Sequence, residues 1–229
     1  MAFSGLPKDY FAFFKELADN NNRAWFEDNK ARYKQNVQTP LLDFVEAMAP
    51  WLKKISKHIV ADPRPVGGSV FRIYKDVRFS KDKSPYKIHG AVQFRHALGK
   101  DAHAPGFYVH LAPREVMYGG GVWMPPSPAL LAVRKSIRDD AAAWRKAVNA
   151  PAFKKRFNEV RGDKLTRPPR GFDADDSNIE DIKRKSFFAM DHGNQKAAMA
   201  PAFVDDVAAA FADAAPLMKF LCKAMGAPF

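Results

Sequence analysis

The sequence predicts an α+β fold, in which helices from both ends of the chain pack on an antiparallel sheet of four to five strands arranged as a meander. Apolar residues recur at helical spacing through about the first sixty residues and again near the C-terminus, whereas between Val70 and Val122 the apolar period changes to two. Gly, Asp, Ser and Pro separate the runs of period two, and connections this short join antiparallel neighbours.

The N-terminal part is expected to be helical. Aromatic and aliphatic side chains from Tyr10 to Leu17 mark a first helix. Asn22 is expected to cap a second helix, because its side-chain oxygen can accept from the free N–H groups of a first turn. Thr39 is expected to cap a third, with Pro40 at the first helical position, where a missing N–H costs nothing.

The strands follow. Period-two alternation predicts strands at residues 70–78, 87–95, 106–112 and 115–122, and the stretch Phe187 to His192 adds a fifth.

The C-terminal part returns to helical spacing. A helix capped by Ser127 is expected to reach about Val148, and a shorter one to begin at Pro151. The stretch 201–226 is helical again, with an interruption expected at Pro216 because proline removes a helix hydrogen bond.

The whole chain, residues 1–229, is expected to be one domain. Its composition is 47% hydrophobic, which is ample for a packed core, and no low-complexity linker or internal repeat divides it. The single cysteine, Cys222, lies in an apolar helical stretch and is expected to be a buried thiol. The sequence shows no signal-peptide pattern and no apolar run of membrane-spanning length, which predicts a soluble, cytoplasmic protein without a membrane partner.

The net charge of +12 is unevenly distributed along the chain. Residues 67–100 carry eight Lys or Arg against two acids, and residues 134–185 carry fifteen against nine, so each window contributes +6. This asymmetry favours an acidic ligand, RNA or DNA as a partner, and we expect one positive cleft that includes Lys81, Lys83 and Arg170. A basic protein that binds nothing specific would have the same composition.

One face of the predicted sheet is expected to be apolar and the other rich in titratable groups. Because side chains alternate along a strand, Phe71, Ile73, Val77, Phe79 and Ile88 are expected to face the core. The candidate catalytic residues on the polar face are His89, His110, Asp76 and Tyr74. The candidate ligand-binding residues are Arg72, Arg78, Lys81, Lys83, Lys87, Arg95 and Tyr108.

The register of these strands decides whether the candidate residues meet. Matching faces place His110 opposite Ala91 and His89 opposite Asp76 or Arg78, which makes the two histidines diagonal neighbours roughly 7 Å apart. Such a cluster suits acid–base chemistry beside an anion pocket. An ordinary solvated sheet face would carry the same residue types.

No metal or cofactor is expected. His89, His96, His103 and His110 recur every seven residues, but a step of seven reverses the face of a strand, so the four cannot converge on one ion. The three glycines at 119–121 are not accompanied by a nucleotide-binding glycine pattern, and a bulge or close strand packing explains them better.

Four segments resemble a known family: WFEDNKARY at 25–33, FRIYKDVRFSKDKSPYKIH at 71–89, GFYVHLAP with GGGVWMP between 106 and 125, and RPPRGFD at 167–173. The chain is similar to the members of a bacterial family of uncharacterised proteins, domain of unknown function 2461. The resemblance extends through most of the chain and implies no particular activity.

Three functional hypotheses follow from the residues. The first is a protein that binds a small anionic or phosphorylated ligand on the polar sheet face and could carry out metal-independent acid–base chemistry there. The second is a nucleic-acid-binding module whose two basic regions follow the phosphates. The third is a non-catalytic interaction scaffold.

Overall fold

The computed structural model describes residues 3–99 and 105–229 and contains a five-stranded antiparallel sheet in the order β1-β2-β3-β4-β5. The strands are β1 (Ile59–Val60), β2 (Gly90–His96), β3 (Gly106–Ala112), β4 (Glu115–Val122) and β5 (Phe187–Gly193). The α+β class and the meander are therefore confirmed. The strands expected at 106–112 and 115–122 match β3 and β4 at both ends.

The strand expected at residues 70–78 is wrong. Val70 and Tyr74 make isolated bridges, to Val92 and Tyr86, and no continuous ladder joins them. Turn chemistry prevails here, because the carboxylate of Asp76 accepts from the N–H of Arg78 two residues on, and Asp82 does the same for Ser84. The free edge of β2 is instead shared by β1 and by residues 69–71.

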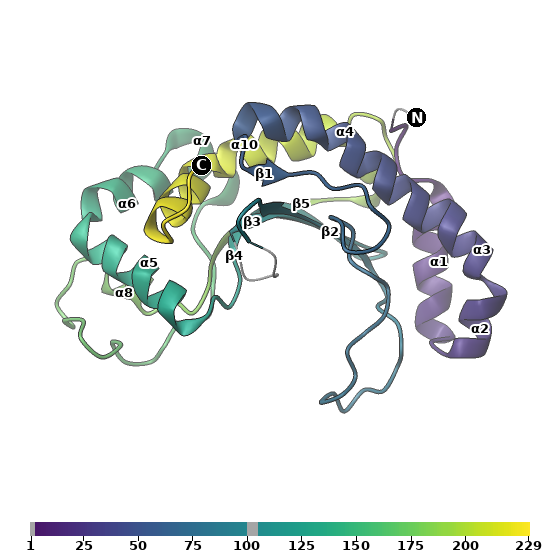
Figure 1. Cartoon of the computed structure of the whole chain (residues 1–229), viewed down its shortest axis with the longest axis horizontal. Coiled ribbons are helices and arrows are strands. Elements are labelled where there is room, and N and C mark those ends of the chain that lie inside the picture. Colours follow the sequence, from purple (N-terminus) through teal and green to yellow (C-terminus); the bar gives the residue numbers. More distant parts are fainter. Residues whose placement is uncertain (1–2, 100–104) are drawn as a thin grey trace.

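Helices cover one face of this sheet. They are α1 (Lys8–Asp19), α2 (Arg23–Asp28), α3 (Lys30–Tyr33), the π-helical segment η1 (Lys34–Gln38), α4 (Thr39–Ile55), α5 (Ser127–Asp139), α6 (Ala141–Val148), α7 (Pro151–Phe157), α8 (Ile179–Ile182), α9 (Gln195–Ala198) and α10 (Phe203–Ala224). Figure 1 shows α4 and α10 lying over the sheet, α1–α3 forming one flank and α5–α8 the other. We call the sheet face turned away from α4 and α10 the open face.

Two expected helix features are confirmed and four are wrong. The side chain of Asn22 accepts from Trp25 N at 3.0 Å, and a helix begins at Pro151. Thr39 does not cap α4, because the helix runs into it through the π-turn of η1. Ser127 does not cap α5 (Ser127–Asp139) but is its first residue, and this helix ends early because Asp140 caps α6. The helix α10 continues through Pro216.

The core lies between the sheet and the helices. Val92, Phe94, Phe107, Val109 and Leu111 are fully buried on this side of β2 and β3. The phenyl rings of Phe107 and Phe211 stack with centroids 4.4 Å apart, which joins the sheet to α10.

Cys222 on α10 is buried in the same core, as expected, and burial raises its thiol pKa to about 11. Among the described residues, none of the helices has the length and apolarity needed to cross a membrane.

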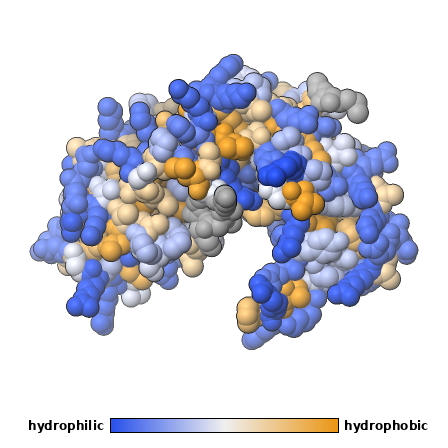
Figure 2. All heavy atoms as spheres, viewed as in Figure 1, coloured by the Kyte–Doolittle hydropathy of each residue, from blue (hydrophilic) through white to orange (hydrophobic). Residues whose placement is uncertain are grey.

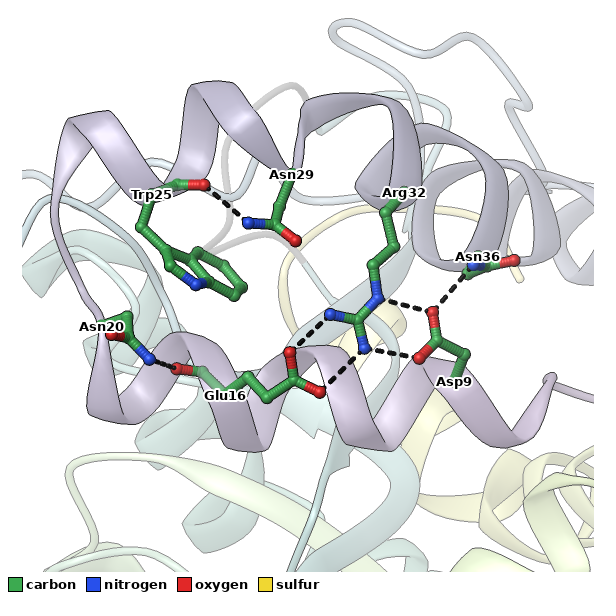
Figure 3. Close-up of polar contacts among 7 residues, drawn as sticks. All are labelled: Asp9, Glu16, Asn20, Trp25, Asn29, Arg32 and Asn36. Atoms are coloured by element: carbon green, nitrogen blue, oxygen red, sulfur yellow. Dashed lines mark hydrogen bonds and ion pairs between the residues drawn. The ribbon is translucent and has the colours of Figure 1, made fainter.

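A double ion pair joins α1 to α3. The guanidinium of Arg32 donates to both carboxylate oxygens of Asp9 and to both of Glu16, and Asn36 adds a bond of 2.8 Å to Asp9 (Figure 3). The Arg32 hydrogen bonds lower the pKa of both carboxyl groups. One cation thus holds together two acids that would otherwise repel each other.

We expect Arg32→Met to lower the free energy of unfolding by about 1–2 kcal/mol at pH 7, because bidentate bonds to two carboxylates are lost. The deficit should shrink as the pH falls through the range where Asp9 and Glu16 take up protons, since groups with a lowered folded pKa stabilise only while ionised. Urea unfolding at pH 7 and near pH 3 measures both. Lys30→Met, which breaks an exposed pair with Glu27, is the control and should cost far less. A deficit independent of pH would contradict the account.

Candidate functional site

Three rows of side chains cross the four long strands on the open face. The first row is Ala91, His110, Met117 and His192. The second is Gln93, Tyr108, Gly119 and Met190. The third is Arg95, Gly106, Gly121 and Phe188. Backbone pairing also places Phe71 beside Ala91 of β2 and Arg161 beside Phe188 of β5. A loop residue therefore extends this grid of three rows at each edge of the sheet.

Glycines hollow the middle of this grid. Gly106 and Gly121 are direct cross-strand partners, and Gly119 lies in the adjoining row. A Cβ on Gly119 would overlap the carbonyl oxygen of Ala189, and one on Gly121 that of Phe187, so β4 and β5 approach too closely for any side chain. The close strand packing expected at 119–121 is confirmed. Gly106 and Gly121 line a cavity of about 460 Å³ on this face.

The cavity walls are mainly aromatic and thioether groups. They come from Phe71, Tyr108, Met117, Trp123, Phe188 and Met190, with the indole ring of Trp123 centred 5.3 Å from the ring of Phe188. The polar lining consists of Gln93 and Arg161. The volume lies within the range of small-molecule sites, and so does the composition of apolar walls with a few polar groups. The open face is thus less polar than its sequence pattern suggests.

A pair of histidines adjoins the cavity. The imidazole rings of His89 and His110 have centroids 4.3 Å apart, and the register that places His110 opposite Ala91 is confirmed. His110 Nδ1 lies 3.3 Å from the hydroxyl of Tyr108, and its Nε2 lies 3.6 Å from Glu115. Because Tyr108 lines the cavity, this hydroxyl connects the histidine pair to the cavity wall.

Burial keeps this pair neutral. The pKa of His89 falls to about 4, first through burial and then through the charges of His110, Lys87 and Lys75. Burial also lowers the pKa of His110, which the carboxylate of Glu115 partly offsets, and raises that of Tyr108 to about 12. Near pH 7 the pair is therefore neutral, and each ring has one nitrogen atom that can donate a hydrogen bond and one that can accept.

Two of the candidate catalytic residues lie elsewhere. His89 does not face Asp76 or Arg78, because the strand that would carry them is absent; these two residues pair with each other in an exposed loop, at 2.6 Å. Tyr74 is 48% exposed and packs beside Tyr86. The structure thus brings together His89 and His110 and leaves Asp76 and Tyr74 outside.

The expected face alternation of the first segment is also wrong. Phe71 lines the cavity on the open face, and the phenyl ring of Phe79 is 96% exposed. Ile88 is 43% exposed, and Val77 is partly exposed. Ile73 is buried as expected. The reason is the irregular backbone after residue 71, where strand periodicity no longer sets the side-chain direction.

Residues 74–86 form a projecting loop, which we call the finger. It is closed at its base by the Tyr74–Tyr86 bridge and carries Arg78, Lys81 and Lys83. The Tyr86 ring stacks on Phe26 at 4.2 Å, and the side-chain amide of Asn21 bonds both backbone groups of Tyr86. In Figure 1 the finger hangs below the sheet, well apart from the α5–α8 flank.

The remaining candidate ligand-binding residues lie closer to the sheet. The ammonium group of Lys87 donates to the carbonyl of Arg72 and lies 5.7 Å from the ring centroid of Phe71, at the cavity wall. Arg95 is partly buried in β2 on the open face, and Tyr108 lines the cavity itself.

The two basic windows do not form one positive cleft. Lys81 and Lys83 lie on the finger, whereas Arg170 belongs to the long loop between α7 and α8 on the opposite flank. Figure 2 shows a hollow between these two parts of the molecule, with hydrophilic residues over most of both flanks. The charge is therefore divided between two projections.

Arg161, Trp123, Phe188 and Met190 line the cavity and were absent from the candidates. Arg161 belongs to a basic loop window, and nothing in its local sequence indicates that it makes a bridge to Phe188 at the outer edge of β5. Trp123 directly follows β4, whose glycine run was a usable signal, because glycines facing one side of a sheet leave room there.

No three His, Cys, Asp or Glu side chains converge as metal ligands within residues 3–99 and 105–229; His103 lies outside these ranges.

A family model described as a conserved hypothetical protein, DUF2461, matches residues 9–220. The chain therefore belongs to this family. Comparison with curated proteins and with solved structures gave no significant match.

The lowered pKa of His89 has a measurable effect on stability. Below pH 6.5 an unfolded chain protonates this histidine, whereas the folded protein does not until about pH 4, so acidification across this interval favours unfolding. We expect His89→Gln to lose less stability than the wild type between about pH 7.5 and pH 4.5, as measured by urea unfolding. His192→Gln, which removes an exposed histidine, should follow the wild type. Parallel curves for all three proteins would contradict the assignment.

Proposed function

We propose that the protein binds a small organic anion in the cavity of the open face, with the apolar or aromatic body of the ligand between the walls and its charged group at Arg161. The observation that carries the proposal is an apolar cavity, lined in part by glycines, with the cationic residue Arg161 in its lining. Aromatic walls favour a planar or apolar body, because burying apolar surface stabilises the complex by about 25 cal/mol per Å².

The electrostatic argument concerns Arg161. This arginine is exposed, its guanidinium lies 3.3 Å from His192, and no described carboxylate lies within ion-pair distance of it. An arginine without an acid partner beside an apolar wall can form two parallel hydrogen bonds to a carboxylate or phosphate. The ligand class is therefore a carboxylate or a phosphate monoester with an apolar body.

The histidine pair adds proton chemistry beside the cavity. The Tyr108 hydroxyl connects His110 to the wall, and the rings of His89 and His110 stay neutral near pH 7 because burial lowers the pKa of both. A metal-independent acid–base reaction on the bound anion would use these two groups, with Glu115 stabilising a protonated His110.

The proposal can be tested with a probe of the same chemistry, 8-anilinonaphthalene-1-sulfonate, whose fluorescence rises in an apolar site. We expect saturable binding of one molecule, about tenfold weaker in Arg161→Gln because a charge-assisted hydrogen bond is lost. The neutral analogue N-phenyl-1-naphthylamine should bind both proteins equally. Met117→Trp should block the cavity and weaken both probes.

Arg170→Gln is the matched control, because it removes an exposed arginine of the same loop that does not line the cavity. It should bind both probes like the wild type. Equal affinity of the sulfonate for wild type and Arg161→Gln, or non-saturable binding to all variants, would refute the cavity as the anion site.

A further inference from the structure

The finger is a fixed projection rather than an open strand of chain. Lys75 donates from its backbone to the carbonyl of Pro85, and its ammonium group pairs with Asp82 at 2.8 Å and bonds Ser84. Lys83 reaches across to the carbonyl of Val77 at 3.0 Å. These contacts tie the two limbs together, and the aromatic stack at Tyr86 fixes them to α2.

Both acidic side chains of the finger form ion pairs with cations of the finger itself. Asp76 pairs with Arg78, and Asp82 pairs with Lys75. Hydrogen bonds from these cations are the main reason why both carboxyl groups have a lowered pKa. Among the described residues, no carboxylate lies within ion-pair distance of the other cations of this region, which are Arg72, Lys81, Lys83 and Lys87. The finger, together with Arg72 and Lys87 beside its base, therefore presents positive charge to any partner.

A single large ring stands among these cations. Phe79 is 96% exposed, more than any other large hydrophobic side chain of the described residues, and the guanidinium of Arg78 lies 5.9 Å from its centroid. Its chain neighbours, Arg78 and Ser80, are polar and exposed. In Figure 2 the finger stands apart from the rest of the surface and is mostly hydrophilic with a small hydrophobic part.

One isolated ring with flanking cations matches single-stranded nucleic acid better than a membrane. A base needs only one aromatic face on which to stack, and lysines on either side can contact successive phosphates. Stable membrane attachment needs a larger apolar area than one side chain gives. In a duplex the bases already stack on each other and leave no free face for Phe79.

We propose that the finger binds single-stranded nucleic acid, with Phe79 stacked on a base and Lys81 and Lys83 on the neighbouring phosphates. This function is separate from anion binding in the cavity and uses none of the residues assigned to it.

The test measures fluorescence anisotropy of a labelled 20-nucleotide oligothymidylate with the full-length protein, across a salt series from about 50 to 200 mM. Phe79→Ala should weaken binding about tenfold without changing the salt dependence, because stacking releases no counterions. Lys81→Gln with Lys83→Gln should weaken binding at low salt and reduce the slope of log affinity against log salt by about 1.4, or about 0.7 for each phosphate contact.

Lys53→Gln with Lys57→Gln is the matched control, because it removes the same charge from exposed lysines at the C-terminal end of α4 and just after it. This control should bind like the wild type. The proposal is overturned if the control weakens binding as much as the finger lysine pair, or if Phe79→Ala binds normally. It is also overturned if the wild type fails to bind the oligonucleotide at low salt, or if Phe79 matters only for vesicles containing phosphatidylserine. Unchanged sulfonate binding by the finger variants keeps this outcome separate from that of the cavity.

Discussion

The close approach of β4 and β5 at Gly119–Gly121 is the constraint on which both faces of the sheet depend. On the helix side, a side chain at Gly120 would meet the ring of Phe107 and the sulfur of Met218, so the glycine lets α10 pack directly on the strand. On the open face, Gly121 and its cross-strand partner Gly106 line the cavity. One run of glycines therefore sets the distance of α10 from the sheet and of β5 from β4, because a Cβ on Gly120 would press on Phe107 and Met218 and one on Gly119 or Gly121 would overlap the backbone of β5.

Both edges of the sheet are completed by irregular chain, and this places the polar groups around an apolar floor. Residues 59–60 and 69–71 share the edge of β2, and residues 161 and 164 add isolated bridges near β5. Short edge segments discourage pairing with other chains, and near β5 Arg161 and Lys164 add charge. The same segments bring Phe71 to one wall of the cavity and Arg161 to the other, so edge protection and site construction use the same residues.

The sequence predicts an element correctly where the local alternation of apolar residues agrees with the long-range strand pairing of the fold. They agree for β3 and β4, where alternation is regular and a neighbouring strand lies on each side, and both were predicted to the residue. They disagree at residues 70–78, where alternation continues but Asp76 and Asp82 satisfy the backbone locally. The histidine pair was predictable because His110 lies on a regular strand. Arg161 was not, since its position comes from a long-range bridge to Phe188.

The distribution of charge follows from the irregular backbone at residues 70–78. An alternating strand would have placed Arg72 and Arg78 on the open face, whereas the turns of the finger carry Arg78 away and leave aromatic side chains there. A floor of low polarity strengthens the field of the few cations that remain at its edge, because water screens them less on that side. The separation of the cations from the floor therefore produces two different surfaces, an apolar cavity lined in part by Arg161 and a solvated cationic projection, for which we propose a small anion and a polyanion respectively.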